Sequence, residues 1–84
     1  MMKNYEYTFV KSLAKSLKER VKVGVQAKVV HDELIVELFR NHEVDFTYRI
    51  KGFSGRILHG YDSDICAREI TNAYKKKVLL SYFY

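Results

Sequence analysis

The side chains in this 84-residue sequence that could do chemistry are three histidines and one cysteine. His31, His42 and His59 would have to converge with carboxylates to bind a metal ion or to act as general bases. The sequence places them in predicted turns at opposite ends of a sheet. We therefore expect all three to be structural or exposed to solvent.

Cys66 lies near the start of a predicted helix, a position that can lower the pKa of a thiol. Asp62, Asp64 and Glu69 would instead raise it, and apolar neighbours indicate a buried, inert thiol. A single cysteine excludes an intramolecular disulfide and a metal site of the Cys-cluster type, and it fits a reducing compartment. The glycines form no phosphate-binding motif. The sequence thus predicts a protein that is not an enzyme and that uses no metal or cofactor.

Composition predicts one globular domain over residues 1–84, because 48% of the residues are apolar and 30% are charged. The 15 basic and 10 acidic residues give a net charge of +5. That excess suits an acidic or nucleic-acid partner, but it also suits an ordinary solvated surface. No apolar run is long enough to cross a membrane, and no signal peptide is recognisable. We therefore expect a cytoplasmic protein.

The hydrophobic period changes twice along the chain. Phe9, Leu13 and Leu17 recur every four residues and predict a helix over residues 5–20. Residues 21–29, 34–38 and 44–50 alternate with period two, which predicts three strands. A second helix is predicted over residues 63–81, with an inward stripe from Ile65 to Val78. The α-β-β-β-α order predicts a two-layer α+β domain, with a three-stranded antiparallel meander and both helices on one face.

Matching the apolar faces of the strands fixes the predicted turns. Pairing Val29 with Leu34 leaves a two-residue turn at His31-Asp32 and sets Gly24 opposite Phe39. The second hairpin needs an odd number of loop residues. The segment 41–43 meets that need, places Leu38 beside Phe46 and Val36 beside Tyr48, and leaves Val44 on the apolar face and Asp45 on the outer face.

One irregular segment, residues 51–61, joins the sheet to the second helix. A short helical turn is expected there, starting near Ser54. Ile57 and Leu58 are predicted to hold this segment against the core.

The outer face of the predicted sheet is both basic and partly apolar. It could be simply solvated, it could be a protein interface, or it could bind nucleic acid through stacked bases and phosphates. The candidate partner face comprises Lys22, Lys28, Ile35, Phe39, Arg49 and Lys51.

The order of elements resembles that of double-stranded-RNA-binding domains. That family grips phosphates with a lysine-rich start of its second helix. Here the second helix opens with Asp62-Ser63-Asp64, which would repel phosphate, so this mode of binding is not expected.

The apolar end of the chain, Val78–Tyr84, has more apolar surface than one helix face can bury. Its rings could fold back over the first helix near Tyr5, Tyr7 and Phe9. Alternatively they could bury against a partner or a second copy, which would make a homodimer.

Three segments resemble small uncharacterised proteins of bacteriophages and prophages of Gram-positive bacteria: Tyr7–Ala14, Gly60-Tyr61 and Ser81–Tyr84. The resemblance implies a cytosolic accessory protein with no assigned activity. We predict a small non-catalytic interaction protein, a phage-encoded modulator of another protein. The alternative is a nucleic-acid-binding module that uses the basic outer face of the sheet.

Overall fold

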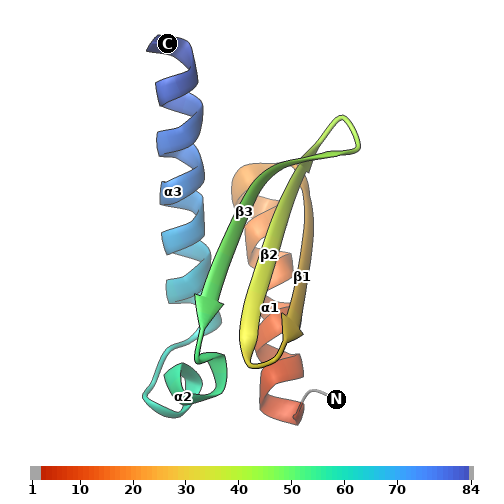
Figure 1. Ribbon diagram of the computed structural model, residues 1–84, viewed down its shortest axis with the longest axis vertical. Coiled ribbons are helices and arrows are strands. Elements are labelled where there is room, and N and C mark those ends of the chain that lie inside the picture. Colours follow the sequence, from red (N-terminus) through yellow and green to blue (C-terminus); the bar gives the residue numbers. More distant parts are fainter. Residues whose placement is uncertain (1–2, 84) are drawn as a thin grey trace.

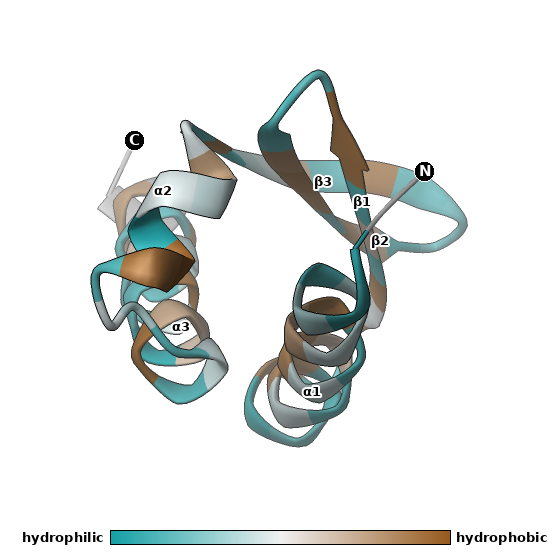
Figure 2. Ribbon diagram, turned by 90° about the horizontal axis from the view of Figure 1, so that it is seen from below, coloured by the Kyte–Doolittle hydropathy of each residue, from teal (hydrophilic) through white to brown (hydrophobic). Residues whose placement is uncertain are grey.

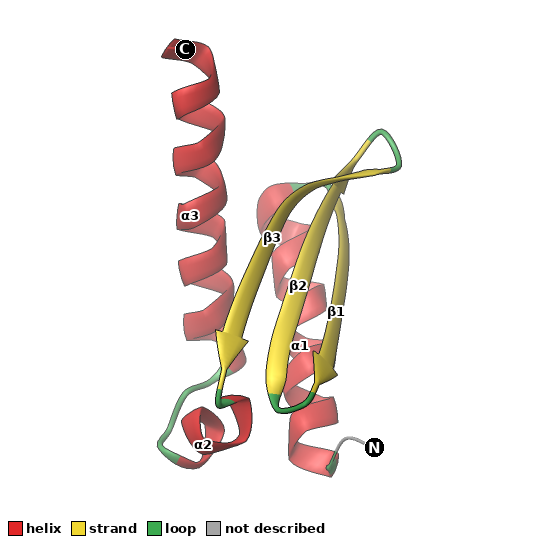
Figure 3. Cartoon of the chain, viewed as in Figure 1, coloured by secondary structure: helices red, strands yellow, loops and turns green. Residues whose placement is uncertain are grey.

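The computed structural model describes residues 3–83, with side chains described as far as residue 80. The elements follow the predicted order, with one short helix added (Figures 1 and 3). They are α1 (Asn4–Val21), β1 (Gly24–Val30), β2 (Glu33–Arg40), β3 (Glu43–Lys51), α2 (Phe53–Leu58) and α3 (Ser63–Phe83). The strands form one antiparallel sheet in the order β1-β2-β3, so the predicted α+β meander is confirmed.

Both long helices lie on the same side of the sheet, as predicted (Figure 2). α1 packs against β1 and against α3. The two helices run in the same direction, because β3 finishes at the end of the sheet where α1 begins and α3 starts from that end, after α2 and its flanking turns (Figure 1). The first and last helices are therefore direct neighbours in one layer.

The core forms where the helix layer meets the central strand. Leu34, Val36 and Leu38 of β2 are completely buried, as are Leu13 and Leu17 of α1. These side chains share one cluster with the buried residues of α3. The apolar residues that alternate along the strands and those that recur every four residues along α1 thus pack into a single core.

The first hairpin has the predicted register. Val29 pairs with Leu34 and Gly24 with Phe39, and the turn is His31-Asp32. Both turn residues have positive φ, at 50° and 59°, which is the geometry of the type I′ turns that suit twisted hairpins. A Cβ added at Gly24 would lie 3.3 Å from Cβ of Phe39, so the bare backbone gives that side chain room.

The second hairpin differs from the prediction. Its turn has two residues, Asn41 and His42, because Arg40 already pairs with Glu43. Leu38 still meets Phe46 and Val36 still meets Tyr48, since a β-bulge at Asp45 restores the matching of faces. Val44 consequently pairs with Phe39 and is 48% exposed, instead of joining the apolar face, while the side chain of Asp45 contacts α3.

The segment after the sheet is held by a residue that the sequence pattern missed. Phe53 is completely buried and meets Phe9 edge-on, with ring centroids 4.9 Å apart. Ile57 packs on the core as predicted, whereas Leu58 is 75% exposed, so its predicted packing is wrong. Because α2 has only six residues, it can turn few side chains inward.

α3 begins at a cap and ends away from the body of the domain. The carboxylate of Asp62 accepts a hydrogen bond of 2.8 Å from the backbone N–H of Ile65, which is the contact that an N-cap side chain makes. The side chain of Ile65 lies partly in solvent, so the predicted inward stripe begins at Cys66.

α3 carries the end of the chain away from the start of α1 (Figure 1). The backbone remains helical to Phe83, at the opposite end of the molecule from Asn4 (Figure 1). Tyr61 stacks on Phe9, with centroids 5.8 Å apart. The rings of Tyr82, Phe83 and Tyr84 lie outside the described side chains. Within the described chain, no helix has the length and apolarity that crossing a membrane requires.

Candidate interaction surfaces

The predicted partner face lies on the outer side of the sheet. Lys28, Ile35 and Arg49 occupy one row across the three strands, as the register predicts. Ile35 is only 8% exposed, however, so it is covered by its neighbours and offers little apolar contact surface. The accessible apolar side chains of this face are half-buried Phe39 beside Val44, and Val30 at the other end of β1, which is 43% exposed.

The cations of this face are matched by carboxylates on β2. Nζ of Lys28 lies 3.9 Å from Oε1 of Glu37, and Nη1 of Arg49 lies 3.4 Å from Oε1 of Glu33. Lys51 pairs with Glu33 in the register. The outer face is therefore close to electrical balance, and the excess positive charge of the chain lies elsewhere.

Lys22 belongs to a different surface from the other predicted residues. It is the C-cap of α1, in the left-handed conformation with φ of 57°, and its N–H bonds to the carbonyl of Lys18. This position continues a row of lysines along α1 rather than the outer face of the sheet.

That row is a lysine stripe on the solvent side of α1. Its members are Lys11, Lys15, Lys18 and Lys22, whose spacings of 4, 3 and 4 residues place them on one helix face. All four are exposed, opposite the buried stripe that contains Leu13. Among the residues that the structure describes, none of the four lies within ion-pair distance of a carboxylate. Nζ of Lys11 lies 5.3 Å from the ring centroid of Tyr7, one turn earlier.

An open hollow of about 820 Å³ adjoins the lysine stripe at Lys18. It combines a cation, a phenyl ring, two amides and an imidazole. The lining residues are Lys18, Gly24, Val25, Gln26, Phe39, Asn41 and His42. Because residue 24 has no side chain, the backbone of β1 and the ring of Phe39 contribute to its wall.

A smaller, mostly apolar groove of about 300 Å³ lies between the end of α1 and the second half of α3. It is lined by Arg20, Val21, Tyr74, Lys75, Val78 and Leu79. Leu79 is 58% exposed and Leu80 is 56% exposed. Leu79 belongs to the groove and Leu80 follows it on α3, whose last turns project past the end of α1 (Figure 1).

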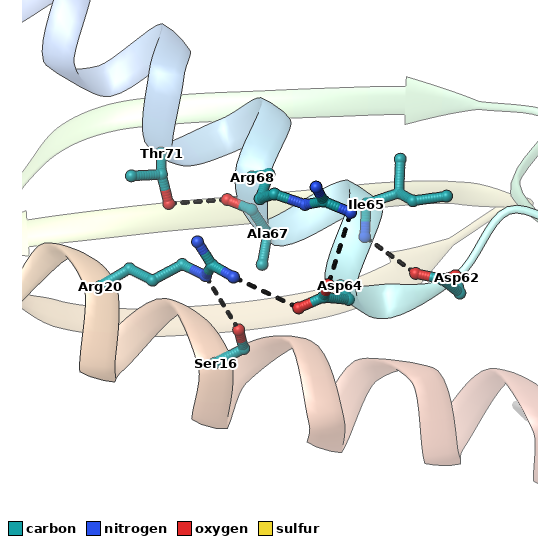
Figure 4. A network of polar contacts seen from close by, with 8 residues as sticks. All are labelled: Ser16, Arg20, Asp62, Asp64, Ile65, Ala67, Arg68 and Thr71. Atoms are coloured by element: carbon teal, nitrogen blue, oxygen red, sulfur yellow. Dashed lines mark hydrogen bonds and ion pairs between the residues drawn. The ribbon is translucent and has the colours of Figure 1, made fainter.

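The start of α3 is occupied by contacts within the domain (Figure 4). Arg20 donates hydrogen bonds to Oγ of Ser16 at 3.2 Å and to Oδ1 of Asp64 at 3.3 Å. Arg68 lies 3.5 Å from the other oxygen of Asp64. Two carboxylates, Asp62 and Asp64, therefore serve the start of this helix and its attachment to α1, and no lysine is present there to hold phosphate.

The titratable groups with altered pKa values serve the core and the sheet–helix contact. Burial raises the pKa of Cys66 to about 11 and also raises that of Tyr61, whose hydroxyl donates to Glu69 over 2.9 Å. Hydrogen bonds from Lys77 and then Tyr74 lower the pKa of Asp45. The predicted character of Cys66 as a buried thiol is confirmed.

The histidines do not converge. His31 and His42 occupy the turns at opposite ends of β2, and His59 ends α2, where its Nδ1 lies 2.7 Å from the carbonyl of Gly55. In the described part of the chain, no group of three His, Cys, Asp or Glu side chains is arranged to hold a metal ion.

The surfaces that sequence reasoning missed are the lysine stripe and the groove. The spacing of the lysines in the sequence indicates the stripe. The groove could not be predicted, because it depends on how α1 and α3 lie against each other. Comparison of the chain with protein-family models, with curated proteins and with solved structures finds no match.

Proposed function

We propose that this protein is a small non-catalytic interaction protein whose protein partner binds the groove between α1 and α3 and the neighbouring leucines of α3. The observation that carries the proposal is the exposure of Leu79 and Leu80 beside an apolar groove. Large apolar side chains that gather in one exposed surface typically mark a contact site. The phage origin and the cytoplasmic location stay predictions.

The charges around the groove indicate the chemistry of the partner. Lys75 lines the groove beside Arg20, whose guanidinium also pairs with Asp64, and Lys76 follows directly on α3. An amphipathic segment with apolar anchors and acidic flanking residues would fill the groove and satisfy its rim. A second copy of the chain fits less well, because it would bring the same basic rim against this one.

The alternative, nucleic-acid binding by the outer face of the sheet, has less support. Glu33 and Glu37 stand between the cations of that face and form ion pairs with two of them. The apolar side chain at its centre, Ile35, is covered.

A displayed library of random peptides tests the proposal without a known partner. Peptides selected on the wild-type protein should carry apolar residues at helical spacing together with Asp or Glu. They should lose binding to the double variant Leu79→Ser, Leu80→Ser and keep binding to Leu58→Ser, which removes an equally exposed leucine from α2. Selected peptides that bind all three proteins alike would contradict the proposal, and so would a library that yields no binders.

Sedimentation velocity decides whether the surface serves a second copy instead. We expect a monomer at all concentrations in both the wild type and the double variant. A wild-type dimer that the double variant abolishes would show that the surface is used for self-association and would overturn the proposed acidic partner.

A further inference from the structure

We propose that the lysine stripe of α1 and the hollow beside it bind single-stranded nucleic acid, with phosphates along the stripe and a base against Phe39. This site is separate from the groove of the proposed function. It shares Phe39 and Lys22 with the partner face that the sequence suggested, but its cations lie on α1 instead of on the sheet.

The first argument is the length and charge of the stripe. Lys11 and Lys22 are 11 residues apart, so the stripe spans about 16 Å along the helix. A small anion would contact only one or two of these lysines, whereas a chain of phosphates can follow all of them. Among the described residues these lysines form no ion pair, unlike Lys28 and Arg49 on the sheet.

The second argument is the content of the hollow that meets the stripe at Lys18. Phe39 offers an aromatic ring, and the amides of Gln26 and Asn41 offer both hydrogen-bond donors and acceptors. A nucleobase has a flat apolar face and a polar edge, which these groups complement. The open hollow, of about 820 Å³, also leaves room for a base to approach Phe39 from solvent.

The combination favours single strands over other polyanions. Proteins that bind single strands join a basic track to aromatic side chains on which bases stack. A duplex keeps its bases stacked inside and would leave Phe39 unused. An acidic peptide or an anionic membrane would satisfy the lysines but would not explain the ring and amides in the hollow.

The groove and the hollow are lined by different residues. The groove meets α1 at Arg20 and Val21 and lies against α3, whereas the hollow meets α1 at Lys18 and lies against β1 and the second hairpin. Separate variants can therefore test the two sites. Failure of one proposal leaves the other standing.

Fluorescence anisotropy with a labelled oligothymidine of about 15 nucleotides measures the binding. The affinity should fall steeply with salt, as expected for release of counterions from phosphates. The triple variant Lys11→Gln, Lys15→Gln, Lys18→Gln should bind about tenfold more weakly or worse, and the log–log salt slope should decrease by roughly 2.

The matched control removes the same charge from the sheet. The variant Lys28→Gln, Arg49→Gln, Lys51→Gln should bind the oligonucleotide nearly as well as the wild type. If this control loses binding and the α1 variant keeps it, the helix site is wrong. If both lose equally, net charge alone explains the binding and the proposal is overturned.

A tryptophan at position 39 tests the hollow directly. The chain contains no other tryptophan, so the emission of Phe39→Trp reports only on this site. Oligothymidine should quench that emission, and the quenching should disappear when Lys11, Lys15 and Lys18 are also replaced by Gln. Binding without quenching would overturn the placement of a base in the hollow.

Three competing probes complete the test. A duplex of the same length, polyglutamate and vesicles rich in phosphatidylserine should each bind more weakly than oligothymidine at equal salt. Equal or tighter binding of any of them would contradict recognition of a single strand, as would absence of oligothymidine binding at low salt.

Discussion

The phenol hydroxyl of Tyr74 donates a hydrogen bond of 2.7 Å to the carboxylate of Asp45. Lys77 adds an ion pair of 2.8 Å to the same carboxylate and also donates to the carbonyl of Asp45. These contacts join the middle of α3 to the bulge of β3. Asp45, which has no partner in the register of β2 and β3, is therefore the residue that connects the sheet to the last helix.

The first prediction concerns the pH dependence of this tie. Hydrogen bonds from Lys77 and Tyr74 lower the pKa of Asp45 in the folded protein, relative to about 3.9 in an unfolded chain. A carboxyl with a lowered folded pKa contributes stability above its unfolded pKa and loses it as the pH falls through the folded value. Asp45→Asn should cost roughly 1 kcal/mol at neutral pH, because the contact is partly exposed to solvent.

Urea unfolding of the wild type and Asp45→Asn at neutral pH and at about pH 2.5 measures this effect, and the difference should shrink in acid. Glu43→Gln is the control, because Glu43 has no ion-pair partner among the described residues. A cost for Asp45→Asn that is the same at both pH values would show that the carboxylate charge contributes nothing.

The second prediction concerns the central strand. Leu38→Ala removes a completely buried side chain and should lower the free energy of unfolding by ~2–5 kcal/mol. In a domain of this size that is a large share of the total stability. Leu58→Ala, at a side chain that is 75% exposed, should change the stability by less than about 0.5 kcal/mol. Thermal and urea unfolding compare the two, and equal losses would mean that β2 does not form the core.

The third prediction uses the two tight turns. His42 has φ of 66°, in the left-handed region that costs a side chain energy and that glycine adopts freely. His42→Gly should raise the free energy of unfolding by roughly 1 kcal/mol and create the Asn-Gly pair that type I′ turns prefer.

Asp32 is the matched comparison, because its φ of 59° is similar. Its carboxylate accepts a hydrogen bond of 2.9 Å from the backbone N–H of Ser54 in α2. Asp32→Gly should therefore gain much less than His42→Gly, or lose stability. Equal gains from both substitutions, measured by urea unfolding, would show that the contact with Ser54 is unimportant.

The fourth prediction concerns the reactivity of Cys66. Burial raises the pKa of its thiol from 9.0 to about 11, so the reactive thiolate is scarce and also shielded. Ellman's reagent should react with the folded protein on the order of a hundredfold more slowly than with the unfolded chain. A cysteine placed at exposed Asn72 in a Cys66→Ala background should react quickly in both states. Rapid reaction of Cys66 in the folded wild type would contradict its burial.

The first hairpin could be predicted in register because two independent signals agree. The apolar alternation of β1 and β2 fixes which faces match, and the distance between them leaves only His31-Asp32 for the turn. The second hairpin offered two solutions of equal parity, a three-residue loop or a two-residue turn with a bulge. Nothing local distinguishes them, because the bulge at Asp45 is stabilised by Tyr74 and Lys77, about 30 residues later in the chain.

The candidate surfaces were harder to predict than the fold. The row of Lys28, Ile35 and Arg49 follows from the register and is confirmed. The positive charges of this row are balanced by diagonal contacts to Glu33 and Glu37. These carboxylates lie two positions along β2 from Ile35, the direct partner of Lys28 and Arg49. The spacing of Lys11, Lys15 and Lys18 already indicates the lysine stripe. Charged residues on the outer face of a helix are usually only solvated, so the spacing alone did not predict a binding site.

The neighbouring arrangement of α1 and α3 has a consequence for how the chain is made. Leu13 and Leu17 are covered in the core that α3 completes, and α3 leaves the ribosome after the other five described elements. Until then the apolar side of α1 and one face of the sheet lack their final cover, so the nascent chain can form a helix and hairpins but not a finished domain. A chain truncated within α3 before Tyr74 would therefore expose apolar side chains of α1 and the sheet. Chaperones and proteases would recognise it as an unfinished domain.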